Sequence, residues 1–168
     1  MTLSPALIKG VVLFPLNVMG VIPAVILWFT GKFESYQFNT ISTVSGGILV
    51  VGGFYTCWVT VSLFTDHGKG TPAPWAPPKI LVVIGIYRYL RNPMMTGVWC
   101  VLIGEADLFM SVGILIWFLV FFTGCMLLVP LCEEPDLERR FGESYREYKR
   151  EVPRWIPRMK SWPRIDDW

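Results

Sequence analysis

Two long uncharged apolar runs constrain this chain more than any other feature. Residues 10–29 and 44–64 contain no charged side chain, and each run is close to the length of about 20 residues that a helix needs to cross a hydrocarbon core. Hydrophobic residues make up 53% of the 168 residues and charged residues only 17%, whereas about a quarter of a soluble domain is charged. We therefore expect one domain, 1–168, that folds in lipid.

A third apolar run is interrupted by two acids. Glu105 and Asp107 separate residues 94–104 from the stretch 108–132. A run as short as 94–104 covers only about half of a bilayer. The segment therefore either crosses the membrane with its acids at the far headgroups, or is re-entrant and leaves the membrane on the side where it entered. We favour a crossing, because the following stretch can then return as a fourth helix. The predicted fold is an all-α integral membrane protein with about four transmembrane helices near 7–29, 44–64, 93–110 and 111–132.

The distribution of basic residues predicts the orientation. The loop 65–93 holds four lysines and arginines against one acid, whereas the turn after the third span is acidic. Such a Lys/Arg bias places this loop and the C-terminal tail in the cytoplasm, with both termini inside. The opening segment has no strongly basic start and no small-residue cleavage site, so we expect it to be retained as a span.

The tail, 133–168, is highly charged but neutral, with nine basic and nine acidic residues. Apolar residues recur in it at helical spacing, Gly142 is expected to interrupt the helix, and Pro153 is expected to end it. This pattern predicts a folded helical cap on the cytoplasmic side. Trp155, Trp162 and Trp168 are expected to lie at headgroup level, where tryptophan is enriched.

Several kinds of chemistry are excluded by composition. A net charge of +2 is too small for a nucleic-acid surface. His67 is the only histidine, and the four cysteines lie in apolar stretches without ligand-type spacing, so we expect buried thiols and no metal site. No glycine-rich nucleotide fingerprint, phosphate loop or serine nucleophile elbow is present.

Polar and aromatic residues gather just before the third span. Tyr87, Arg88, Arg91 and Asn92 precede Pro93, which suits the first position of a helix. The free N–H groups of a helix N-terminus favour a carboxylate or a phosphate. The alternative is a basic anchor at the membrane surface with a helix cap at Asn92.

Two adjacent carboxylates, Glu133 and Glu134, follow the fourth span directly. Acids at the end of an apolar helix resist burial unless a cation meets them. They either pair with Arg88, Arg91 or the arginines of the tail, or one of them faces a cationic ligand.

Two linked motifs together resemble a known family. Residues 81–97, with the sequence Leu-Val-Val-Ile-Gly-Ile-Tyr-Arg-Tyr-Leu-Arg-Asn-Pro-Met-Met-Thr-Gly, precede a hydrophobic hairpin and the acidic motif at 133–154. This arrangement is similar to the isoprenylcysteine carboxyl methyltransferase and phospholipid methyltransferase group, over about 71–158. The commonest form of the family has Arg-His-Pro where this chain has Arg91-Asn92-Pro93, and a tyrosine in place of Met95. The asparagine variant is associated with prokaryotic members, which points to a prokaryotic plasma membrane.

The resemblance implies S-adenosyl-L-methionine as the methyl donor. By motif position the donor would contact Lys79, Ile80, Leu81, Val82, Tyr87, Arg91, Asn92, Pro93, Met94, Met95 and Glu133. Glu134 is the nearest candidate base if the acceptor is an amine. Eukaryotic prenylcysteine enzymes of the group carry an arginine where this chain has Val129, so we do not expect a carboxylate acceptor here.

The resulting prediction is a membrane-embedded S-adenosylmethionine-dependent methyltransferase. Its acceptor would be a small or amphiphilic, lipid-like molecule, with membrane lipid as its surroundings and no nucleic-acid partner. Membrane sterol and enone reductases, which use NADPH and carry a similar Arg-His-Pro segment, are the alternative, but the acidic pattern at 133–142 favours methyltransferases. A non-catalytic relic is the third reading, motivated by Asn92 and Met95.

Overall fold

The computed structural model describes residues 12–33, 39–67 and 80–163, and all regular structure in these ranges is helical. The prediction of an all-α chain is therefore confirmed for this part of the protein. The elements are η1 (Val12–Val21), α2 (Ile22–Phe29), α3 (Thr40–Asp66), η2 (Gly85–Arg88), α4 (Pro93–Leu108), α5 (Val112–Leu128), η3 (Val129–Glu133), α6 (Glu134–Phe141) and α7 (Glu143–Glu151).

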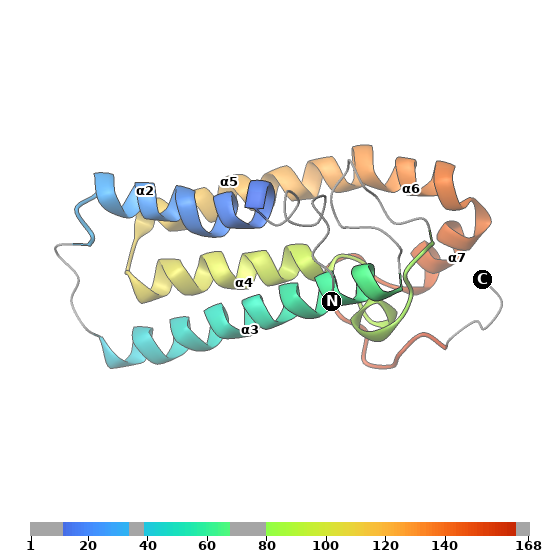
Figure 1. The fold of residues 1–168 in the computed structure, drawn as a ribbon, viewed down its shortest axis with the longest axis horizontal. Helices are drawn as coiled ribbons and strands as arrows, with labels where there is room; N and C mark the ends of the chain where they lie inside the picture. Colours follow the sequence, from blue (N-terminus) through green and yellow to red (C-terminus); the bar gives the residue numbers. More distant parts are fainter. Residues whose placement is uncertain (1–11, 34–38, 68–79, 164–168) are drawn as a thin grey trace.

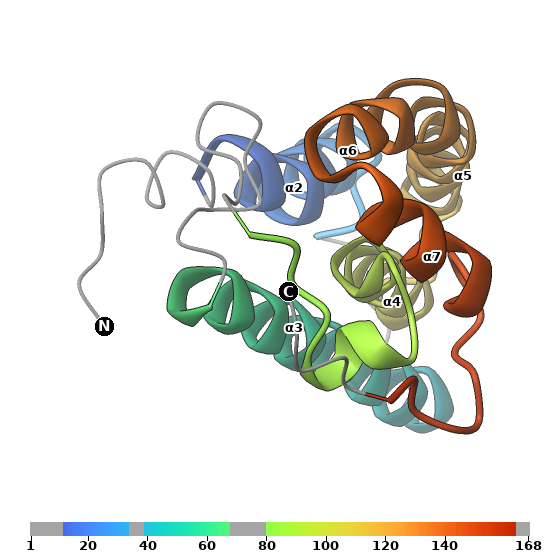
Figure 2. The same cartoon turned by 90° about the vertical axis from the view of Figure 1, so that its right-hand side faces the viewer.

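Four helical segments run alternately in opposite directions and form an elongated bundle (Figure 1). The segments are η1 with α2, then α3, α4 and α5, and the contact between α3 and α4 is the most extensive. Helices α6 and α7 lie at one end of the bundle, together with η2 and the chain after α7 (Figures 1 and 2). We call α6, α7 and residues 152–163 the cap.

The helices differ in their ability to cross a membrane. Helix α3 and the continuous helical stretch Val112–Phe141 are long and apolar enough to span it, whereas the apolar helix Pro15–Phe29 is shorter. Helix α4 has 16 residues and begins at Pro93, as the sequence predicts, but ends at Leu108. Past residue 132, the predicted end of the fourth span, the chain stays helical through the π-helical η3 into α6, and the end of the span itself stays a prediction. Residues 7–11 of the first predicted span lie outside the described residues.

Large apolar side chains cover the outside of the bundle. Trp28, Phe29, Ile48 and Val51 expose between 67% and 84% of their surface, and further exposed leucines and valines follow along α5. A water-soluble protein rarely exposes so much contiguous apolar surface. Lipid is the solvent that this surface fits.

The turn between α4 and α5 is short, as a tight hairpin requires. Met110 adopts a positive φ of 45°, and the buried Ser111 hydroxyl accepts a hydrogen bond from the Ile114 amide, which caps α5. Asp107, near the end of α4, accepts a hydrogen bond from the Ser45 hydroxyl of α3. The acids that interrupt the third apolar run therefore lie at the end of the bundle opposite the cap.

Glycines allow α3 and α4 to approach at backbone distance. A Cβ added at Gly53 would lie 2.5 Å from the carbonyl oxygen of Gly97, and one added at Gly46 would lie 2.6 Å from that of Gly104. Real Cβ atoms do not approach a backbone oxygen so closely, and small residues at such contacts are a general means of packing membrane helices. The glycine pairs, two turns apart on each helix, set the distance between α3 and α4.

The cap has its own small core. Tyr145, Tyr148, Val152 and Trp162 are buried together, and Leu81 packs against them. Helix α6 ends at Gly142, whose φ is 59°, so the predicted helix break is confirmed.

Of the three tryptophans expected at headgroup level, Trp162 is buried in the core of the cap, which leaves it no exposed face to anchor in headgroups, and Trp168 lies outside the described residues. Trp162 is buried because its amide donates to the Arg88 carbonyl and draws the chain inward. Trp155 packs on Trp99 of α4, with the ring centroids 4.7 Å apart.

The glycine contact gives a direct test of the packing. Gly53→Ala should lower the free energy of unfolding by about 1–3 kcal/mol, the usual cost of overpacking a core. Gly52→Ala is the matched control, because no atom lies within 4 Å of a Cβ at that position. Thermal unfolding in one detergent measures both. Equal melting temperatures for the two variants would contradict the close contact.

Candidate functional site

The segment before α4 is held in place by the cap. Residues 80–84 have no regular structure and lead into the single turn η2, where Tyr87 is buried. The Tyr148 hydroxyl donates to the Tyr87 carbonyl at 2.7 Å, and the Arg158 amide donates to the Tyr89 carbonyl at 3.0 Å. The first sequence motif is therefore folded against the second.

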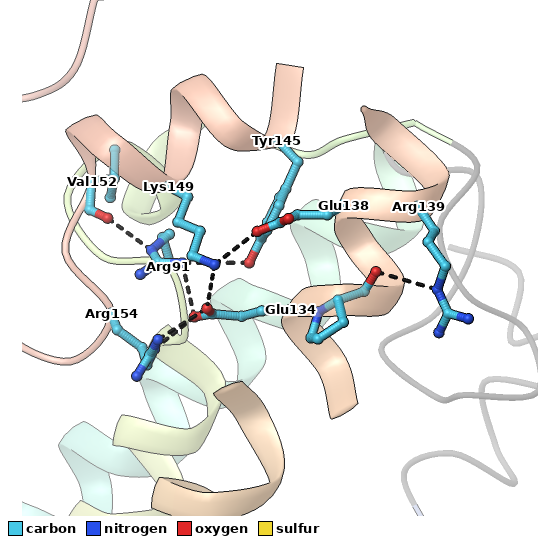
Figure 3. Close-up of polar contacts among 9 residues, drawn as sticks. Arg91, Glu134, Glu138, Arg139, Tyr145, Lys149, Val152 and Arg154 are labelled. Atoms are coloured by element: carbon cyan, nitrogen blue, oxygen red, sulfur yellow. Dashed lines mark hydrogen bonds and ion pairs between the residues drawn. The ribbon is translucent and has the colours of Figure 1, made fainter. Parts of the chain in front are cut away.

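Arg91 is the most firmly bound residue of this segment. Its amide donates to the Pro153 carbonyl at 3.0 Å and its Nε to the Val152 carbonyl at 2.8 Å. Its Nη1 reaches Glu134 at 2.9 Å and also the Tyr145 hydroxyl at 3.4 Å. All of these partners belong to the cap, so Arg91 joins the start of α4 to the cap (Figure 3).

Glu134 is buried and surrounded by cations. Its Oε1 lies 2.9 Å from Arg91 Nη1 and 2.6 Å from Arg154 Nε, and its Oε2 lies 2.9 Å from Arg154 Nη2 and 3.1 Å from Lys149 Nζ. Figure 3 shows these side chains reaching Glu134 from three segments of the chain. Lys149 is shared with Glu138, at 2.7 Å. Two of the pairings that the sequence left open, with Arg91 and with an arginine of the tail, are thus present.

The surrounding charges control the ionisation of Glu134, which lies past the apolar part of its helix. Burial alone would raise the pKa of this carboxyl, but the Arg154 hydrogen bond and the charges of Arg91 and Lys149 lower it below its usual value. The hydrogen bond to Glu138 raises the pKa of Lys149 in turn. Glu134 is therefore a carboxylate with little tendency to take up a proton, and its assignment as a base remains an untested prediction.

Glu133 has a different environment. It is the last residue of η3 and is exposed, and within the described residues no ion pair or hydrogen bond involves its carboxylate. It closes the π-helical turn η3, which also contains Pro130, and such turns are frequent at functional sites. An acid at the cap end of the bundle is thus open to a cationic ligand.

The first turn of α4 lies beside this acid-rich segment. Asn92 occupies the N-cap position, but its side chain makes no capping hydrogen bond, so the predicted side-chain cap is absent. Pro93 is buried. The sulfur atoms of Met95 and Cys125 are 3.9 Å apart, which joins this turn to α5, and the Met94 carbonyl accepts from the Cys57 thiol.

Most of the predicted donor residues come together at the cap end. Tyr87, Arg91, Asn92, Pro93, Met94, Met95, Glu133 and Glu134 belong to this group. Leu81 packs on the cap core, Val82 is buried and Ile80 is exposed, whereas Lys79 lies outside the described residues.

Sequence reasoning did not single out Arg154, Lys149 and Tyr145 as partners in this site. Lys149 is one of the basic residues in the last turn of α7, and Arg154 was anticipated only as one of the arginines of the tail, whereas nothing in the sequence pattern indicated Tyr145. The contact between Trp99 and Trp155 was also not predicted; their buried indole nitrogens have no hydrogen-bond partner among the described residues.

In the described part of the chain no group of three or more His, Cys, Asp or Glu side chains could hold a metal ion. Cys57 and Cys125 are buried, as expected of apolar thiols, whereas Cys100 is only partly buried and Cys132, in η3, is exposed.

A helical bundle with apolar outer faces and a polar, capped end is the architecture of a helical membrane protein. The model of the phospholipid methyltransferase family matches residues 41–144, which is more than half of the chain, so the protein belongs to this family. The match includes α3, α4, α5 and most of the acidic motif.

Two curated relatives are similar to this chain. Methanethiol S-methyltransferase 2 of Bradyrhizobium diazoefficiens is 35% identical over 82 residues, which is 49% of this chain and 30% of the relative. Methanethiol S-methyltransferase of Mycobacterium tuberculosis is 37% identical over 78 residues, 46% of this chain and 29% of the relative. The matched segments thus cover less than a third of these relatives. No solved structure matches.

Proposed function

We propose that this protein is a membrane-embedded methyltransferase that uses S-adenosyl-L-methionine and binds it at the cap end of the bundle. One observation carries the proposal: the two motifs implied to hold the donor meet there, through the ion pair of Arg91 with Glu134. Membership of a methyltransferase family supports the reaction class. It also disfavours the NADPH-dependent reductase, for which no comparison gives support.

The residues at the cap end suit the polar groups of the donor. Glu133, exposed and without a cationic partner in the described residues, offers a carboxylate to its ammonium or sulfonium charge. The start of α4 offers N–H groups that the Asn92 side chain does not cap, which suits its carboxylate. When bound, the donor supplies an electrophilic methyl group. This chain would bind and orient it and exclude water from it.

We further propose a small thiol as the acceptor, in preference to a lipid. Both curated relatives are named for S-methylation of methanethiol. Val129, at the position where the prenylcysteine enzymes have an arginine, is buried and apolar, and a carboxylate drawn in there would lose its hydration without gaining a cation. A thiol can enter the site uncharged and so needs no resident cation for binding. Its proton would pass to water as its sulfur bonds to the methyl group, while the sulfonium–methyl bond of the donor breaks and S-adenosylhomocysteine leaves.

The donor assignment is tested by calorimetry with S-adenosylhomocysteine, the product form of the donor. Glu133→Gln should weaken its binding by about tenfold to a hundredfold, the value of a hydrogen bond to a charged group. Glu143→Gln is the control, because Glu143 is an exposed acid of the same cap, paired with Arg146 and Arg150 on the surface. Equal affinity for wild type and Glu133→Gln, or binding of NADPH instead, would contradict the proposal.

All four helical segments are proposed to cross the bilayer, with the cap and both termini in the cytoplasm of a prokaryotic cell. The support comes from the alternating direction of the segments (Figure 1), the exposed apolar faces, and the Lys/Arg bias of the loop 65–93. Helix α4, about 24 Å long at 1.5 Å per residue, is shorter than the hydrocarbon core. It can cross only where the bilayer is thin or where flanking residues extend it.

Cysteine labelling in a cysteine-free background tests this orientation. Met159→Cys lies on the cap, where the native side chain is 97% exposed, and Lys32→Cys lies in the turn after α2 at the opposite end. An impermeant thiol reagent added to intact cells should label the second and spare the first. Labelling of both residues from one side would show that the number of crossings is wrong.

A further inference from the structure

Asn92 and Glu133 are both proposed to contact the donor, and the residues next to them in the chain form a buried ion pair with each other. Arg91 precedes Asn92 at the start of α4, and Glu134 follows Glu133 at the end of η3. The Arg91 and Glu134 side chains are 8% and 2% exposed, and their charged atoms are 2.9 Å apart. One contact therefore joins the two parts of the chain that the proposed function places around the donor.

We propose that Glu134 is a positioning residue for the donor site, which it holds through Arg91, and that it is not a base. This inference rests on the proposed function. Glu134 fixes where Glu133 lies relative to the first turn of α4, so that the acid and the helix N-terminus can meet opposite ends of the same amino-acid group.

The geometry of the carboxylate argues against proton transfer. A carboxylate accepts about four hydrogen bonds, and four nitrogen atoms lie within 3.1 Å of the two Glu134 oxygens. A proton could bind only by displacing one of these cationic donors, of which Arg91 is itself buried and would lose its partner there. The side chain is also almost fully enclosed, so an acceptor molecule has no free oxygen to approach.

Arg91 is bound from its other side as well. Its amide and its Nε donate to the carbonyls of Pro153 and Val152, at the end of α7. These bonds hold the backbone that continues into Asn92 and Pro93. The Arg154 and Lys149 side chains also bind Glu134, but within the described residues neither side chain bonds to the start of α4. Arg91 is therefore the partner through which Glu134 acts on the donor site.

Steady-state kinetics with the full chain in lipid nanodiscs separate positioning from base catalysis. S-adenosylmethionine is varied at a fixed, saturating concentration of a small alkanethiol, for wild type and Glu134→Gln. A positioning role raises the donor KM, and the Kd of S-adenosylhomocysteine, by about tenfold or more, while kcat at saturating donor stays within about threefold. A collapse of kcat with unchanged donor affinity would overturn the inference and assign a base.

A pair of arginine variants distinguishes positioning from general stability of the cap. Arg91→Gln and Arg154→Gln each remove one cation from Glu134, but only Arg91 is attached to Asn92. The inference predicts that Arg91→Gln weakens S-adenosylhomocysteine binding several-fold more than Arg154→Gln does, at temperatures where both variants are folded. Equal loss of binding would overturn it. This comparison also decides the question if Glu134→Gln does not fold.

Glu143→Gln is the control for charge removal in the cap, since its partners Arg146 and Arg150 lie on the surface. It should leave donor affinity unchanged. Binding by wild-type protein distinguishes failure of the proposed function from failure of the positioning role. If wild type does not bind S-adenosylhomocysteine, the proposed function fails; if wild type binds it and Glu134→Gln binds it equally well, only the positioning role fails.

Discussion

The buried carboxylate of Glu134 is the constraint on which the polar end of this molecule depends. Three cations, Arg91, Lys149 and Arg154, converge on it from the start of α4, from α7 and from the chain beyond α7. A carboxylate that is 2% exposed costs several kcal/mol of lost hydration, which only well-placed cations offset. Through these contacts Glu134 links the start of α4, helix α7 and the chain beyond α7.

A second constraint, of a different kind, sets the apolar part of the fold. Gly46 and Gly53 of α3 lie against Gly104 and Gly97 of α4, without room for a methyl group between the helices. Lipid tails are as apolar as the side chains, so close backbone approach replaces the hydrophobic effect as the means of association. The glycines fix α4 beside α3, and the ion pair then fixes the cap on the first turn of α4.

Local chemistry made part of this structure predictable from the sequence. Pro93 as a helix start and Gly142 as a break follow from single residues, and the apolar runs follow from composition. For Glu133 and Glu134, two possibilities stayed open: pairing with arginines of the protein or contact with a cationic ligand. A carboxylate suits both equally.

Other features depend on contacts between distant segments. The glycine pairs could not be predicted, because they require the relative rotation of α3 and α4. Trp162 was expected at the headgroups, but a hydrogen bond to the Arg88 carbonyl folds the chain back and buries it. Arg154 lies 20 residues from Glu134 and reaches it only because the chain reverses after α7.

The most direct test of the account is methyl transfer by the purified protein in liposomes, with isotopically labelled S-adenosylmethionine. A small alkanethiol, phospholipid and a farnesylcysteine analogue are offered in competition. The account predicts label in the methyl thioether and none in the other two products. Label on the farnesylcysteine or the phospholipid alone would contradict the proposed acceptor. No label on any acceptor, together with no binding of the donor, would contradict the assignment of a donor site at the cap.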